Sequence, residues 1–136
     1  MDPKSPALRS PCPIAGALDL VGDRWTLVVL RDLLLANKRR FSELAQPEGI
    51  ATNVLTERLR RLEGAGLVSR EPDPEDGRRR IYTPTERAWE LVPLMLDLAI
   101  FGFDHCGGTA HPELVEAARA DRDGLIATLR GGEHGG

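Results

Sequence analysis

Residues 52–70 read TNVLTERLRRLEGAGLVSR and carry the clearest structural pattern in the chain. Leu55, Leu59 and Leu62 follow the spacing i, i+4, i+7, which places them on one face of a helix that begins near Thr52. The helix should end at Gly66, because glycine readily adopts the left-handed conformation that closes many helices. This stretch therefore predicts an amphipathic helix with one buried and one exposed face.

A β-hairpin should follow this helix directly. Residues 67–70 (LVSR) and 80–83 (RIYT) alternate in polarity as two short strands do. Between them residues 73–78 read DPEDGR, and the Asp-Gly step in this segment is a strong signal for a hairpin turn.

Periodic apolar residues predict helices on both sides of this core. A short helix should open at Ser42, whose side chain can act as its N-cap. The expected fold class is mainly α with a small β-hairpin, in the order α-α-α-α-β-β-α-α, which is the layout of a winged helix-turn-helix. The other expected helices span residues 14–21, 24–35, 85–104 and 112–129.

The length of 136 residues allows one compact domain. We expect residues 12–130 to form it. Residues 1–11 are rich in Pro and Ser and should be loose, and residues 131–136, GGEHGG, should be disordered.

Composition indicates a cytoplasmic protein. Two cysteines are too few for a disulfide scaffold and favour a reducing compartment. The most apolar run, residues 91–103, falls short of the ~20 residues that a membrane span needs, and no signal peptide is evident.

Charge is distributed unevenly around a net value of −3. Residues 24–87 carry 13 Lys and Arg against 10 Asp and Glu, whereas residues 88–136 carry 3 against 8. An excess of positive charge in the central section is compatible with a nucleic-acid partner.

The polar face of the central helix supplies groups suited to DNA. Asn53 can pair with adenine, and Arg60 can reach guanine or a phosphate. Arg58 and Arg61 flank the helix and would neutralise phosphates, and the hairpin tip adds three consecutive arginines. The alternative is that these arginines form a solvated surface and pair with nearby carboxylates, namely Glu57, Glu63, Asp73, Glu75 and Asp76. The predicted DNA-contact set is Arg40, Ser42, Thr52, Asn53, Thr56, Arg58, Arg60, Arg61, Arg78, Arg79 and Arg80.

Several linked motifs within residues 12–102 carry a family resemblance. LVGDRWTL at residues 20–27, RFSEL at 40–44 and LTERLRRLE at 55–63 resemble the HxlR-type regulators of bacteria. The resemblance implies a dimeric winged helix that represses or activates a nearby promoter. The wing is more similar to that of MarR-type regulators. Ala51 stands where the family usually has a capping serine, so we expect Thr52 to cap the recognition helix instead.

Dimerisation has separate support in the sequence. Ten of the thirteen residues from Leu91 to Phe103 are apolar, whereas a surface helix of a monomer needs a single apolar stripe. The alternative is a central helix wrapped by its own domain. The predicted dimer contacts are Ile14, Leu18, Leu91, Leu94, Leu98 and Phe101.

Cys12 lies just before a predicted helix and matches a position where some HxlR-type proteins carry a redox-sensing thiol. Packing at the dimer interface is the alternative role. His105, Cys106 and His111 match no established zinc spacing, so no metal or other cofactor is expected.

The absence of a phosphate-binding loop, a zincin motif or a nucleophile elbow argues against an enzyme. The expected partner is an operator in double-stranded DNA, and the sequence does not identify an effector. Two other classes stay open: a winged helix that binds only proteins, and a thiol redox enzyme. The first should lack the two arginine clusters, and the second usually needs a resolving cysteine nearby.

Overall fold

The computed structural model describes residues 10–135 in two compact units, the first of which ends at Ala88. The boundary lies inside the 12–130 domain that the sequence predicts. Residues 1–9, which form most of the predicted loose N-terminal segment, and residue 136 lie outside the described part of the chain.

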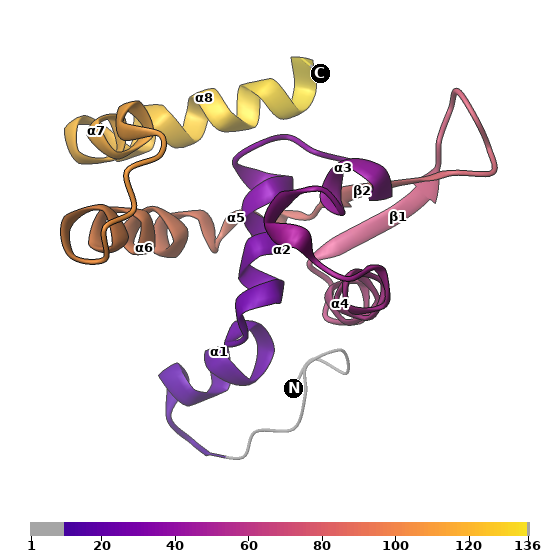
Figure 1. Ribbon diagram of the computed structural model, residues 1–136, viewed down its shortest axis with the longest axis horizontal. Helices are drawn as coiled ribbons and strands as arrows, with labels where there is room; N and C mark the ends of the chain where they lie inside the picture. Colours follow the sequence, from indigo (N-terminus) through magenta and orange to yellow (C-terminus); the bar gives the residue numbers. More distant parts are fainter. Residues whose placement is uncertain (1–9, 136) are drawn as a thin grey trace. The chain divides into compact units, whose positions relative to one another are not determined.

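The first unit has the element order of a winged helix-turn-helix, which confirms the predicted fold class (Figure 1). Its elements are α1 (Pro13–Val21), α2 (Arg24–Leu34), α3 (Phe41–Leu44), the 3-10 turn η1 (Pro47–Gly49), α4 (Thr52–Gly64), β1 (Val68–Pro72) and β2 (Arg80–Pro84), with α5 (Glu86–Trp89) at the boundary.

Helix α2 is the centre of this unit and packs against α3, α4 and β2. Val29, Leu30 and Leu33 are fully buried in it. The buried residues of α2 therefore lie on more than one side of the helix.

Helix α4 matches its predicted face and its predicted end. Leu55, Leu59 and Leu62 are buried. Gly66 adopts a φ of 77°, and the next residue, Leu67, donates its N–H to the carbonyl of Leu62 over 2.9 Å. This closing arrangement satisfies terminal carbonyls and directs the chain into β1.

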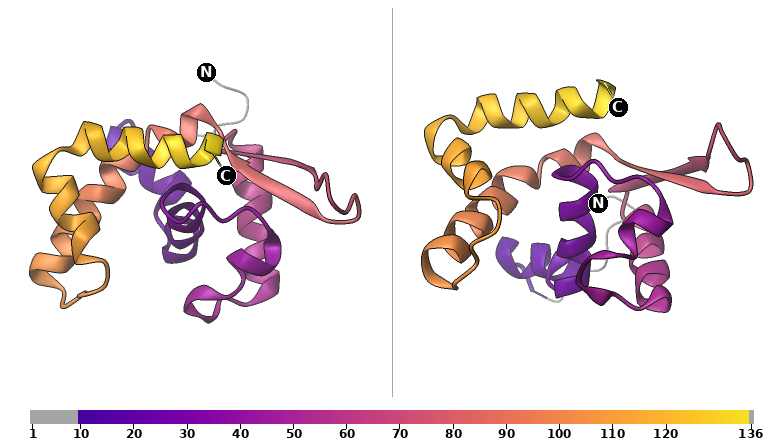
Figure 2. Two further views of the ribbon diagram at one scale, coloured as in Figure 1. Left: turned by 90° about the horizontal axis from the view of Figure 1, so that it is seen from above. Right: turned by 45° about the horizontal axis from the view of Figure 1, so that its top comes forward.

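Strands β1 and β2 pair antiparallel, and the hairpin projects away from the helices of its unit (Figure 2). Its base is fixed on one side by the segment before α3. Arg40 forms an isolated bridge with Ile81, and the Tyr82 N–H donates to the Arg39 carbonyl over 2.8 Å. Backbone hydrogen bonds thus connect the wing to the helix-turn-helix.

The second unit differs from the prediction of one long helix over residues 85–104. The chain breaks after α5 and resumes in α6 (Val92–His105). Pro93 accounts for the break, because it has no N–H to donate to the Trp89 carbonyl and its ring clashes with that carbonyl in a continuous helix.

The predicted helix over residues 112–129 is also divided, into α7 (Pro112–Ala120) and α8 (Arg122–Gly135). Asp121 between them has φ −158° and ψ 86°, and its carboxylate accepts the Gly124 N–H over 3.0 Å. This carboxylate therefore caps a new helix. Helix α8 continues through residues 131–135, for which the sequence predicts disorder. Glycine lowers the stability of a helix end but does not prevent a helix from forming there.

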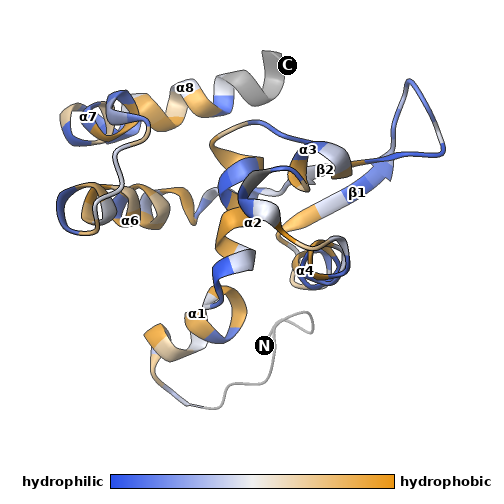
Figure 3. Cartoon of the chain, viewed as in Figure 1, coloured by the Kyte–Doolittle hydropathy of each residue, from blue (hydrophilic) through white to orange (hydrophobic). Residues whose placement is uncertain are grey.

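Two helices expose large apolar side chains, and both are mainly hydrophobic in Figure 3. On α1, Ile14 is 71% exposed and Leu18 lies one turn further on. On α6, Leu94, Leu98 and Phe101 follow the spacing i, i+4, i+7 and are also exposed. Each helix therefore carries an apolar face toward solvent, made of residues that the sequence predicts as dimer contacts; Leu91, the remaining member of that set, is half-buried.

No helix among the described residues is long and apolar enough to cross a membrane.

Candidate nucleic-acid interface

Helices α3 and α4, joined through η1, form the helix-turn-helix pair. The predicted N-cap role of Ser42 is wrong: α3 begins at Phe41, and the N-cap position is Arg40, whose N–H donates to the Glu43 carboxylate over 3.1 Å. A carboxylate in the first turn can bond the free N–H groups there, so the helix begins earlier than the serine suggests. Ser42 is exposed on α3.

The exposed face of α4 contains the residues predicted to contact bases. Thr52, Asn53 and Arg60 are exposed, and Thr56 is half-buried with its hydroxyl donating to the Thr52 carbonyl over 2.8 Å. Among the side chains that the structure describes, those of residues 10–46 and 48–131, Arg60 has no ion-pair partner. Asn53 and Arg60 are therefore available to a ligand.

Thr52 does not cap α4, contrary to the prediction. The N-cap position is Ala51, and Thr52 is the first helical residue. Alanine has no side-chain acceptor, so the N-terminus of α4 has no side-chain cap.

Arg58 and Arg61 are bound within the protein. Arg58 Nε donates to Asp23 Oδ2 over 2.8 Å, and Arg61 Nη2 donates to Asp23 Oδ1 over 2.7 Å. Arg58 also pairs with Glu57. The structure thus places both guanidinium groups on carboxylates, where the sequence expected them to neutralise phosphates.

Asp23 is ionised over an unusually wide pH range. Burial raises the pKa of its carboxyl, but hydrogen bonds from Thr26 and Arg58 outweigh this and lower the pKa from 3.8 to about 2. A depressed folded-state pKa contributes stability above the unfolded value of 3.8, and this contribution is lost as the pH falls toward 2.

We expect Asp23→Asn to lower the free energy of unfolding by about 1 kcal/mol at pH 6, which allows for the screening of a partly exposed pair. The difference from wild type should shrink between pH 4 and pH 2, because the wild-type carboxyl then becomes neutral like the amide. Urea denaturation followed by circular dichroism at several pH values measures it. A difference that stays constant down to pH 2 would contradict the assignment.

The wing loop has seven residues between Pro72 and Arg80 and is shaped by two aspartates. Asp73 Oδ1 accepts the Glu75 N–H over 2.9 Å, and Asp76 Oδ1 accepts the Arg78 N–H over 3.1 Å. The predicted hairpin is confirmed. Its turn is not the two-residue Asp-Gly type, since Gly77 does not have the positive φ that this type requires.

Arg40 connects this loop to α3. Asp73 is buried, and its Oδ2 accepts from Arg40 Nε over 2.9 Å. The bond from Arg40 lowers the pKa of Asp73 below its usual value. The wing loop is therefore held in place by a charge pair as well as by the strand ladder.

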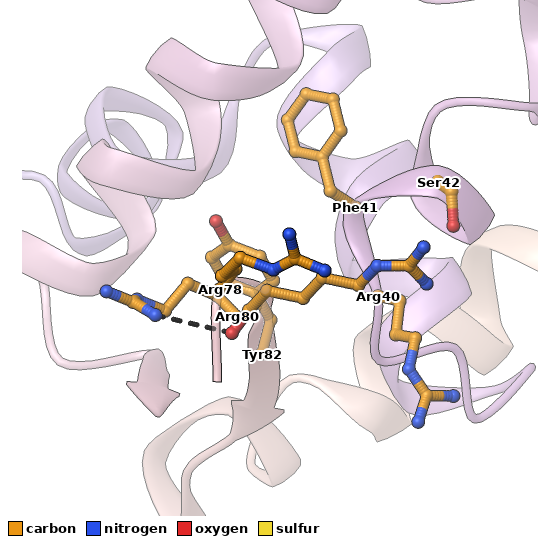
Figure 4. A pocket seen from close by; sticks show the side chains of 7 residues that line it. Arg40, Phe41, Ser42, Arg78, Arg80 and Tyr82 are labelled. Atoms are coloured by element: carbon orange, nitrogen blue, oxygen red, sulfur yellow. Dashed lines mark hydrogen bonds between the residues drawn. The ribbon is translucent and has the colours of Figure 1, made fainter. Parts of the chain in front are cut away.

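An open pocket of about 460 Å³ lies between the wing and the start of α3 (Figure 4). Asp76 partly neutralises Arg78 and Arg79, which lie 3.2 and 3.6 Å from its oxygens. Arg80 donates to the carbonyls of Gly77 and Arg79, and it has no acidic partner among the described side chains. The pocket therefore offers guanidinium groups to an anion. Its lining residues are Arg40, Phe41, Ser42, Arg78, Arg79, Arg80 and Tyr82.

Sequence reasoning missed Asp23, and it offered Asp73 only as one of several carboxylates that could pair with the arginines. Asp23 directly precedes α2, so its position as an N-cap was detectable. Its pairing with arginines 35 and 38 residues away was not. The pairing of Asp73 with Arg40 likewise depends on the tertiary fold.

Cys12 is exposed and occupies the N-cap position of α1, as predicted from its place before that helix. His105, Cys106 and His111 do not gather: in the described part of the chain no three Cys, His, Asp or Glu side chains lie together as metal ligands would.

The chain matches the model of the HxlR-like helix-turn-helix family over residues 20–109. An HTH-type transcriptional regulator of Synechocystis is 36% identical over 93 residues, which cover 68% of this chain and 69% of the relative. Another from Mycobacterium bovis is 34% identical over 117 residues, covering 75% and 73%.

Solved structures are similar as well. PA1607, described as a candidate transcription factor, matches with a TM-score of 0.65 and 33% identity over 71% of this chain and 67% of that one. The redox regulator HypR in its reduced form matches with a TM-score of 0.60 and 28% identity over 68% and 92%. On these matches and on the fold, the chain belongs to the HxlR-like helix-turn-helix family.

Proposed function

We infer that this DNA-binding transcriptional regulator binds an inverted-repeat operator as a homodimer. Helix α4 enters the major groove, with Asn53 and Arg60 at base edges and Thr52 and Thr56 beside them. The arginine-rich wing contacts the adjacent backbone. The observation that carries the proposal is the free polar face of α4 in the same compact unit as the arginine-rich hairpin.

The apolar faces of α1 and α6 support the dimer. Exposed large apolar side chains at helical spacing are the usual mark of a surface that a partner covers. A second copy of the chain is the partner we propose, because an operator with twofold symmetry requires two identical DNA-binding domains. Such a regulator must reach the chromosome, so we place it in the cytoplasm.

We expect Asn53→Ala and Arg60→Ala each to reduce the preference for operator over scrambled DNA by roughly 1–3 kcal/mol per lost base contact. Fluorescence anisotropy with the DNA upstream of the gene and a scrambled duplex measures the ratio. Arg70→Ala is the matched control, because it removes the same charge from an exposed arginine that pairs with Glu63 on the same unit. If both α4 variants discriminate as well as wild type, α4 is not the helix that contacts bases.

A redox response through Cys12 is a second part of the proposal. The thiol is exposed at the N-terminus of α1, and it lies two residues from the exposed Ile14. Oxidation there would alter a helix that we place in the dimer contact.

Diamide should therefore weaken operator binding by wild type and by Cys106→Ser, whereas Cys12→Ser should bind DNA equally with and without diamide. Gel-shift titrations with oxidised and reduced protein test this. A Cys12→Ser protein that responds as wild type does would rule Cys12 out as the sensor.

A further inference from the structure

A single carboxylate lies between the start of α2 and the recognition helix α4. Asp23 caps α2 by accepting the Thr26 N–H over 3.3 Å and the Thr26 hydroxyl over 2.5 Å. The same two oxygens accept from Arg58 and Arg61 of α4. Arg61 Nη2 also donates to the Thr26 hydroxyl oxygen over 3.0 Å, so all four side chains form one network.

The two arginines differ in how easily they could leave this network. The Arg58 side chain is 21% exposed and also pairs with Glu57, whereas the Arg61 side chain is 41% exposed. On the α4 wheel Arg61 follows Arg60 by about 100°, at the edge of the face that carries Asn53. Arg61 is therefore the member of the pair that could reach a nearby phosphate if Asp23 released it.

A free arginine at this edge would add affinity for any duplex. Phosphate contacts carry no sequence information, and each one makes the salt dependence steeper. Arg61 gives no such contact while Asp23 and the Thr26 hydroxyl hold its guanidinium group. It can, however, fix the angle at which α4 lies on α2, and base contacts depend on that angle.

We propose that Asp23 is a specificity-determining positioning residue, which withholds Arg61 from the DNA backbone and orients α4 on α2. The inference rests on the proposed DNA binding through α4. When the protein binds its operator, the network stays intact, because base contacts require the orientation of α4 that the network sets. On non-operator DNA no base contact requires this orientation, and Arg61 stays paired only because Asp23 holds it.

Asp23→Asn tests the proposal while preserving the cap, because asparagine is as good an N-cap as aspartate. We expect affinity for scrambled duplex to rise about tenfold at low salt, and the ratio of operator to scrambled affinity to fall by a similar factor. The slope of log affinity against log salt on scrambled DNA should steepen by about 2 for a dimer that gains one phosphate contact per subunit. A loss of stability alone would not steepen this slope.

Two further variants make the result decisive. Asp123→Asn makes the same change in charge at an exposed site on α8 and should leave the slope unchanged. Adding Arg61→Gln to Asp23→Asn should cancel the gain in affinity. An Asp23→Asn protein with wild-type slope and specificity, or a gain that survives in the double variant, would overturn the proposal.

Arg61→Gln alone keeps the test informative even if Asp23→Asn folds poorly. Its salt slope should equal that of wild type, because Arg61 is withheld from phosphates when Asp23 is present. A slope that becomes flatter by about 2 would mean that Arg61 already contacts the backbone, which contradicts the proposal. If the wild-type protein binds neither operator nor scrambled duplex, the proposed function itself is wrong. If it binds operator DNA but the variants behave differently from these expectations, only the role of Asp23 is wrong.

Discussion

Leu98→Asp is expected to convert the dimer into monomers and to remove tight operator binding with it. Leu98 lies in the middle of the exposed apolar face of α6, between Leu94 and Phe101. Each dimer would bury two uncompensated carboxylates, each costing several kcal/mol. The dimer dissociation constant should rise by roughly a thousandfold or more. Analytical ultracentrifugation and anisotropy on the same samples would follow assembly and DNA binding together.

Thr109→Asp is the matched control for this variant. Thr109 is exposed in the segment after α6, outside the apolar face, so the same added charge should leave the protein dimeric. A Leu98→Asp protein that stays dimeric would show that this face is not the interface. A monomer that keeps wild-type operator affinity would separate dimerisation from DNA binding and contradict the proposal.

Replacement of Arg78, Arg79 and Arg80 together by glutamine should produce the second large effect. If each subunit neutralises about four phosphates, three of them through these arginines, a dimer neutralises ~8 phosphates, and the slope of log affinity against log salt is about −7. Loss of the six wing arginines should reduce the slope to about −2. Affinity for operator and scrambled DNA should fall alike, on the order of a thousandfold or more, since these contacts carry no sequence information.

The triple replacement by lysine is the control for charge. Lysine keeps a positive group that can contact a phosphate, although it loses the bidentate geometry of arginine. We therefore expect the lysine protein to retain most of the salt slope. A glutamine protein whose salt slope equals that of wild type would show that the wing does not contact the backbone.

The sequence predicted best the elements whose signals are local. The leucine spacing in α4 and the glycine at its end depend on a few neighbouring residues, and both appear where expected. The same reasoning could have found the break before α6, because Pro93 was visible within the apolar run. The prediction of one long helix gives more weight to the apolar pattern than to the Trp89 carbonyl, which Pro93 leaves without a donor.

The charge pairs of the candidate site could not be predicted in this way. Arg58 and Arg61 look like phosphate ligands in the sequence, and their binding to Asp23 depends on the packing of α4 against α2. The wing loop is a related case. The Asp-Gly step predicts a hairpin turn in this segment, but it does not predict that Asp73 pairs with Arg40, which precedes it by 33 residues.

Hydroxyl-radical footprinting of wild-type protein on the DNA upstream of its gene would show whether a dimer recognises an operator through α4. We expect protection on one face of the duplex at two inverted half-sites, with centres one helical turn, about 34 Å, apart. Two chains should be bound per duplex, and Asn53→Ala should lose the pattern. Protection by one chain at a single site, or equal protection along the whole fragment, would contradict the claim that a dimer recognises an operator through α4.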